Sequence, residues 1–165
     1  MPILSSYARK KKIHYFLEPI AKDASILEIG SGGGWVGQYL RQGGWTGYVG
    51  LDLRQPADFV GDIRDWRTLG LAAESFDYMI AFEVVEHVDC FQECYDLLKP
   101  TGKLLLTSPV PKMDWVMKWL EIIGLNQKRT SPHDFLVDLT TVDIFPVKRV
   151  RLVAGLSQWG VFAKQ

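Results

Sequence analysis

The pattern of apolar and polar residues predicts strands that alternate with helices along most of the chain. Short apolar runs typical of buried strands occur at Ser25–Ile29, Tyr48–Leu51, Phe59–Val60, Phe76–Phe82 and Gly102–Ser108. Apolar residues at helical spacing predict helices at Tyr7–Ala21, Trp35–Gln42, Val85–Leu98 and Lys112–Ile123. This alternation is typical of a doubly wound α/β sheet with mostly parallel strands and helices on both faces.

The alternation changes at two places. Phe59–Val60 follows the second strand so closely that the crossover helix expected between them is reduced or missing. Further along, Val147–Val153 and Gln158–Ala163 read as two strands close enough to pair as an antiparallel hairpin.

The length of 165 residues suits one domain with one substantial core. It is too short for a nucleotide-binding domain and a separate substrate domain. We therefore expect a single domain, with an N-terminal helical segment at 1–22, a cofactor-binding core at 23–110, and a lid or acceptor region with the last two strands at 111–165.

Charge and cysteine content limit which partners and which cellular compartment are expected. The chain has 19 basic and 19 acidic residues, so no nucleic-acid partner is expected, and the basic run Arg9–Lys12 reads as a solvated charge run. Two cysteines four residues apart do not make the disulfide framework of a secreted protein. The N-terminus lacks the apolar core of a signal peptide, and no apolar run has the length of a membrane span. The expectation is a soluble, cytoplasmic protein.

The segment Ile26–Trp35 carries the most functional information. An apolar strand containing Glu28 leads into glycines at alternate positions, Gly30, Gly32 and Gly34. Glycine tolerates positive φ and has no Cβ to hold a ligand away from the backbone. The segment therefore predicts a nucleotide-type binding turn.

Two classes of ligand use such a turn followed by an acidic residue at the end of the second strand. The dinucleotide fingerprint, counted from Gly30, requires a small residue where this chain has Trp35, and it fits only if moved to Gly32, Gly34 and Gly37, past the strand end. No phosphate-binding lysine motif is present. An NAD(P)-dependent oxidoreductase therefore stays as an alternative. The pattern acidic-x-Gly-x-Gly-x-Gly, in contrast, matches this segment without any shift.

Over about residues 25 to 110 the chain resembles the class I S-adenosylmethionine-dependent methyltransferases. Several segments resemble the family's motifs in order: Glu28 to Gly34, Gly50-Leu51-Asp52, Gly61-Asp62-Ile63, Phe76-Asp77 with Phe82 to Val88, and Leu98-Lys99-Pro100-x-Gly102-x-Leu104. The resemblance implies a Rossmann-like fold, S-adenosylmethionine as cofactor, and methyl transfer by in-line displacement to a small-molecule acceptor that the sequence does not identify.

The resemblance also implies roles for particular residues. Asp52 would receive the ribose hydroxyls, Asp62 the adenine amino group, and Ile63 would pack on the adenine ring. Trp35 would lie beside the methionine end, or else in the core. Glu28 would organise the glycine turn or contact the cofactor. The complete predicted set is Glu28, Gly30, Ser31, Gly32, Gly34, Trp35, Asp52, Leu53, Asp62, Ile63, Phe82, Glu83 and His87.

A general base is needed only when the acceptor must lose a proton. For a hydroxyl acceptor the candidates are His133, His87 and Glu83, which fall in loops or element ends on the side where such sheets bind ligands. His87, Cys90 and Cys94 would share one face of the predicted helix Val85–Leu98. Three ligands on one helix make a poor metal site, so we expect no metal and interpret the cysteines as buried thiols.

The predicted helix 112–123 has one narrow polar stripe, formed by Asp114, Lys118 and Glu121, and is otherwise apolar. Such a helix needs more than one covered face. It could be a lid over the acceptor, a homodimer contact, a membrane-surface contact, or a segment packed between the sheet and the N-terminal helix. A non-catalytic, methyltransferase-like binding domain that acts through this Trp-rich helix is a second alternative.

Overall fold

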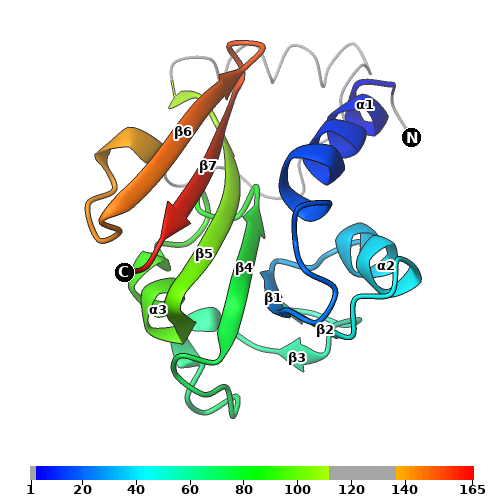
Figure 1. Cartoon of the computed structure of the whole chain (residues 1–165), viewed down its shortest axis with the longest axis vertical. Coiled ribbons are helices and arrows are strands. Elements are labelled where there is room, and N and C mark those ends of the chain that lie inside the picture. Colours follow the sequence, from blue (N-terminus) through cyan, green and yellow to red (C-terminus); the bar gives the residue numbers. More distant parts are fainter. Residues whose placement is uncertain (1–2, 112–136) are drawn as a thin grey trace.

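A computed structural model describes residues 3–111 and 137–165, with side chains from residue 6 onward (Figure 1). The helical elements are α1 (Ile3–Lys12), η1 (Ile13–Leu17), α2 (Trp35–Gln42), η2 (Ile63–Asp65), α3 (Phe91–Leu97) and η4 (Leu139–Thr141). The strands are β1 (Ser25–Ile29), β2 (Gly47–Asp52), β3 (Phe59–Val60), β4 (Phe76–Phe82), β5 (Leu98–Pro109), β6 (Val147–Val153) and β7 (Ser157–Ala163). Among the described residues, no helix is long and apolar enough to cross a membrane.

The strands form one sheet in the order β3-β2-β1-β4-β5-β7-β6. The pairs from β3 through β5 are parallel, whereas β7 pairs antiparallel with both β5 and β6. This topology confirms the predicted mixed sheet with a C-terminal antiparallel hairpin. It places the carboxyl ends of β1, β2 and β4 at one edge, where ligands bind in sheets of this kind.

Most predicted boundaries agree with the structure to within a residue or two. The predicted bounds of β1, α2, β3, β4 and β6 are confirmed. No helix lies between β2 and β3, so the expected loss of that crossover is also confirmed. The fifth strand is longer than predicted and already begins at Leu98.

The N-terminal helix differs from its prediction. A single helix over Tyr7–Ala21 was expected, but α1 starts at Ile3 and passes at Ile13 into the π-helical turn η1. Phe16 and Leu17 in that turn are both buried in the core. The helix ends just before Pro19, whose ring nitrogen has no N–H to continue the hydrogen-bond ladder.

The helix predicted over Val85–Leu98 is wrong in its first half. His87 N and Val88 N both donate to Val84 O in an isolated turn, and α3 begins only at Phe91. Cys90 has an extended φ of −136° and precedes the helix. His87, Cys90 and Cys94 therefore do not share one helix face, although both cysteines are buried free thiols as expected.

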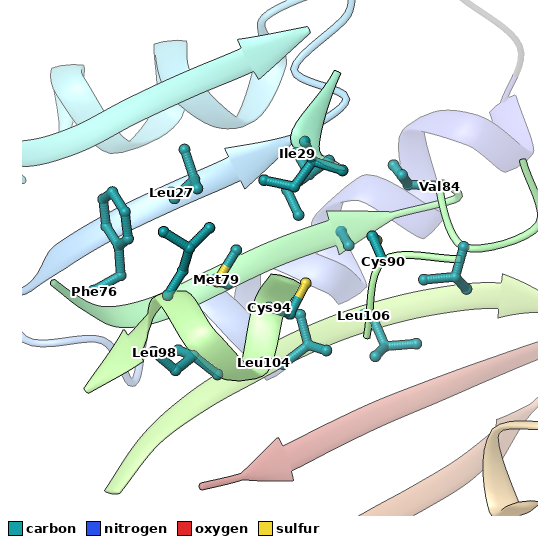
Figure 2. Close-up of a cluster of buried hydrophobic side chains, with 14 of the residues drawn as sticks. Leu27, Ile29, Phe76, Met79, Val84, Cys90, Cys94, Leu98, Leu104 and Leu106 are labelled. Carbon is teal, nitrogen blue, oxygen red and sulfur yellow. The ribbon is translucent and has the colours of Figure 1, made fainter. Parts of the chain in front are cut away.

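The core has one layer on each face of the sheet. Leu27, Met79 and Leu104 point to the face covered by α3, where Figure 2 shows them with Cys94 and Leu98. Ile26 and Ile80 alternate to the other face and pack with residues of η1, α2 and β7, namely Phe16, Leu17, Val36, Leu40 and Trp159. The alternation of side chains along each strand thus confirms helices on both faces. The predicted helix 112–123 and the predicted base His133 lie outside the described residues.

Candidate active site

The turn after β1 adopts a backbone conformation that favours glycine. Gly30, Gly32 and Gly34 have φ values of 71°, 42° and 68°. The turn is fixed to the end of β2, because Gly30 N and Ser31 N donate to Leu51 O at 2.8 and 3.2 Å. A Cβ on Gly30 would lie 2.6 Å from Val84 Cγ2, so the segment after β4 packs directly against the turn.

Asp52, the last residue of β2, faces this turn. Its Oδ2 accepts from Gly32 N at 2.8 Å and its Oδ1 accepts from Arg54 N at 3.1 Å. The side chain is partly exposed, and each carboxylate oxygen can accept a further hydrogen bond. The carboxylate is therefore held in one orientation beside the glycine turn, where it can receive a diol.

Glu28 is buried in the protein, and its carboxyl group is hydrogen-bonded to Tyr48. Only 4% of Glu28 is exposed, and the Tyr48 hydroxyl donates to its Oε2. Burial raises the pKa of Glu28 to about 8, more than the hydrogen bond from Tyr48 lowers it. Gly37 of α2 makes room for the Tyr48 ring, since a Cβ there would lie 2.7 Å from it. This arrangement favours the turn-organising role for Glu28 over direct ligand contact.

Asp62 has a partner that the sequence reasoning missed. Its Oδ1 accepts from Arg64 N at 2.9 Å and Arg64 Nε at 3.0 Å, and its Oδ2 accepts from the guanidinium at 2.5 Å. These hydrogen bonds hold the pKa of Asp62 below its usual range. The predicted contact of Asp62 with an adenine amino group therefore competes with Arg64. Of the residues predicted beside it, Ile63 is 2% exposed in the core, while Leu53 is 69% exposed.

Two aromatic rings and two cations gather beside the glycine turn. The rings of Trp35 and Phe82 are nearly parallel, at 15°, with centroids 6.1 Å apart. The Arg9 guanidinium lies 5.3 Å from the Trp35 ring and the Lys12 ammonium 5.1 Å from the Phe82 ring. Apart from the basic run in α1, no pattern in the sequence predicts these contacts between cations and rings. That run is equally consistent with charges exposed to solvent.

Glu83, at the end of β4, has a left-handed φ of 59°. Its Oε1 accepts from Lys12 Nζ at 2.9 Å and from Thr107 Oγ1 at 2.7 Å, so three elements meet at this carboxylate. A non-glycine residue in this conformation is uncommon and often marks a functional site. His87 lies half-buried in the turn that follows.

Glu86, in the same turn, is fully buried. Within the described part of the chain, neither of its carboxyl oxygens has a hydrogen-bond partner, and the buried hydroxyls of Ser108 and Ser31 also lack one. Burial is the main cause that raises the pKa of Glu86 to about 8, and repulsion by Glu83 adds to it. No cluster of three metal-ligating side chains suited to an ion occurs in the described ranges.

Comparison with known proteins identifies the family. Residues 5–147 match the model of a family described as a methyltransferase domain. The chain belongs to this methyltransferase family. It is a class I S-adenosylmethionine-dependent methyltransferase domain.

Solved structures share the fold of this methyltransferase. The PH0226 protein of Pyrococcus horikoshii is 19% identical with a TM-score of 0.66, and 97% of this chain and 91% of that one are covered. A structure described as a SAM dependent methyltransferase from Archaeoglobus fulgidus is 14% identical with a TM-score of 0.65, over 96% of this chain and 94% of the other.

Curated relatives are longer than this methyltransferase chain. A ubiquinone biosynthesis O-methyltransferase of Cereibacter sphaeroides is 28% identical over 81% of this chain, which corresponds to 65% of the relative. The mitochondrial ubiquinone biosynthesis O-methyltransferase of Rattus norvegicus is 35% identical over 50% of this chain and 30% of its own length. The chain thus spans less than two thirds of the relatives it matches.

The residues at the site fit the methyl donor. The backbone of the left-handed turn is accessible to a ligand. A Cβ on Gly34 would meet no protein atom within 4 Å, and one on Gly32 would lie 4.0 Å from Asp52 Oδ2, so a side chain at either position would occupy space that a ligand can use. Asp52 supplies two acceptor oxygens next to this backbone. Trp35 and Phe82 supply aromatic faces of the kind that attract a cation.

Proposed function

We propose that this methyltransferase transfers the methyl group of S-adenosylmethionine to a hydroxyl of a small-molecule acceptor by in-line displacement. The observation that carries the proposal is the hydrogen bond from Gly32 N to Asp52 Oδ2, which holds the Asp52 carboxylate beside the left-handed glycine turn. The hydroxyl acceptor is suggested by relatives named ubiquinone biosynthesis O-methyltransferases.

The donor side would be bound by backbone and carboxylate groups. The turn from Gly30 to Gly34 would lie against the methionine and ribose part, and Asp52 would accept from both ribose hydroxyls. Asp62 would reach the adenine amino group once Arg64 releases it. Bound S-adenosylmethionine supplies a methyl group already activated by a cationic sulfur, so the protein has mainly to orient the reactants and exclude water.

The acceptor side would be formed where α1 approaches the ends of β4 and β5. Phe82 and Trp35 offer apolar surface there, and the ion pair of Lys12 with Glu83 closes it from the side of α1. Of the three predicted bases, Glu83 and His87 lie in the described part of the site. Glu83 Oε1 already accepts hydrogen bonds from Lys12 and Thr107, so an acceptor hydroxyl would compete with these two donors for that oxygen.

Calorimetric titration tests the donor site. We expect S-adenosylmethionine and S-adenosylhomocysteine to bind and NAD to give no signal. Asp52→Asn should weaken both by roughly 10- to 100-fold, because each hydrogen bond to a charged group contributes about 1.5 to 3 kcal/mol. Asp23→Asn is the matched control, since Asp23 is exposed and precedes β1 at the opposite end of the sheet.

The outcomes separate the competing functions. Binding of NAD in place of the methyl donor would favour the oxidoreductase. Donor binding without methylation of any hydroxylated small molecule would favour the non-catalytic binding domain. The contact of helix 112–123 with a membrane surface or a second copy stays a prediction.

A further inference from the structure

Glu86 is an acidic side chain that the donor-binding contacts above do not use. It is 0% exposed, and within the described residues both its oxygens lack a hydrogen-bond donor. Burial of a carboxylate without hydrogen bonds is unfavourable, so a buried carboxyl in such a place retains its proton. In the ligand-free protein Glu86 is therefore mainly neutral at pH 7, consistent with its pKa of about 8.

The charges that act on Glu86 lie on α1 and on the segment that contains Glu86 itself. Lys12 of α1 favours its ionised form, whereas Glu83 on its own segment opposes that form more strongly. Lys12 is already engaged by Glu83 at 2.9 Å, and only 12% of its side chain is exposed. The positive charge near Glu86 is thus balanced by Glu83, and Glu86 is left without a counter-ion.

The position of Glu86 relative to the glycine turn follows from Val84. Val84 Cγ2 lies 2.6 Å from the position that a Cβ of Gly30 would take, and Val84 O accepts from the backbone N–H of His87. The short turn that contains Glu86 is therefore built directly against the turn assigned to the methyl donor. Figure 2 shows Val84 close to the end of β4, beyond Ile29 of β1.

We propose that Glu86 senses the positive charge of the methyl donor. It holds a proton in the ligand-free protein and releases that proton to solvent when the cationic sulfur of S-adenosylmethionine binds, leaving a carboxylate as counter-ion. The neutral sulfur of S-adenosylhomocysteine gives no such release. The inference rests on the proposed function, since it assumes that this site binds the donor, and it adds a way to distinguish donor from product by charge.

The expected proton release follows from the two states of Glu86. A cation within about 4–6 Å lowers a carboxyl pKa by roughly 1 to 3. Starting from a pKa of about 8, donor binding at pH 7 should release roughly 0.4 to 0.9 proton more than product binding. Donor affinity should accordingly rise roughly three- to eight-fold per pH unit near pH 7 relative to product affinity.

The experiment is calorimetry of both ligands at pH 7 in buffers of different ionisation enthalpy, with wild type and Glu86→Gln. We expect a donor-minus-product proton difference in wild type that disappears in Glu86→Gln. Asp23→Asn is the matched control, because it also removes one carboxyl, from an exposed residue that precedes β1 at the opposite end of the sheet, and the difference should persist in it. Equal release with both ligands, or a difference that persists in Glu86→Gln, would refute the inference.

A second measurement keeps the test independent of how the variant folds. Infrared difference spectra of wild type should show a protonated carboxyl band that is lost with S-adenosylmethionine and kept with S-adenosylhomocysteine. A band unchanged by both ligands would overturn the role of Glu86 while leaving the proposed function intact. If neither ligand bound wild type at all, the proposed function itself would fail, and this inference with it.

Discussion

Substitution of Glu28 by Gln tests the buried carboxyl behind the glycine turn. Burial raises the pKa of Glu28 from 4.5 to about 8, and the Tyr48 hydroxyl donates to it. Gln has nearly the same shape and retains an acceptor oxygen for Tyr48, but it carries no ionisable proton. The substitution therefore removes the titration of this side chain and leaves its main contact.

The sign of the pH dependence follows from the raised pKa. Because the folded protein holds the proton more tightly than the unfolded chain, the contribution of Glu28 to stability is fully present below pH 4.5 and is lost as the pH rises through 8. Each rise of one pH unit in this window lowers the free energy of unfolding by about 1.4 kcal/mol. Across the window the free energy of unfolding of wild type should fall by roughly 4 to 5 kcal/mol relative to Glu28→Gln.

Urea unfolding of both proteins from pH 5 to pH 9, with the slope m checked for two-state behaviour, measures this difference. Glu86 titrates in a similar range, but it is present in both proteins and cancels when one curve is subtracted from the other. We expect the free energy of unfolding of the variant, measured relative to that of wild type, to rise steadily up to about pH 8 and to level off above that pH. Parallel curves would show that Glu28 titrates normally in the folded protein, and would refute the reasoning.

Two further predictions concern the donor site. Gly30→Ala should destabilise the protein by roughly 1 to 3 kcal/mol and weaken donor binding, because φ is 71° and the new Cβ meets Val84 Cγ2 at 2.6 Å. Gly33→Ala, whose Cβ meets nothing within 4 Å, is the matched control in thermal melts and titrations, and equal losses in both would contradict a specific role for the contact. Arg64→Ala should tighten S-adenosylhomocysteine binding by up to about five-fold, since Asp62 is freed from an exposed ion pair, and weaker binding in calorimetry would show that Arg64 itself contacts the ligand.

The positions of the strands along the chain and of the glycine turn were predictable because both depend on local patterns. Apolar runs located β1 and β4 to the residue, and the short spacing before β3 correctly predicted the missing crossover helix. Periodicity failed after β4, where it predicted one helix from Val85 to Leu98. Val85 and Val88 pack in the core although they form only an isolated turn, and burial of that kind gives the same pattern as a helix face.

The sequence by itself determined the sheet, the glycine turn and the acidic residue at the end of β2, because each is specified by residues that are neighbours in the chain. Only the tertiary structure decided which charges meet. Lys12 reaches Glu83 across 71 residues, and Glu86 is 0% exposed in the assembled fold. Pairing and desolvation depend on distances between segments far apart in the chain, and those distances are set by folding rather than by any local motif.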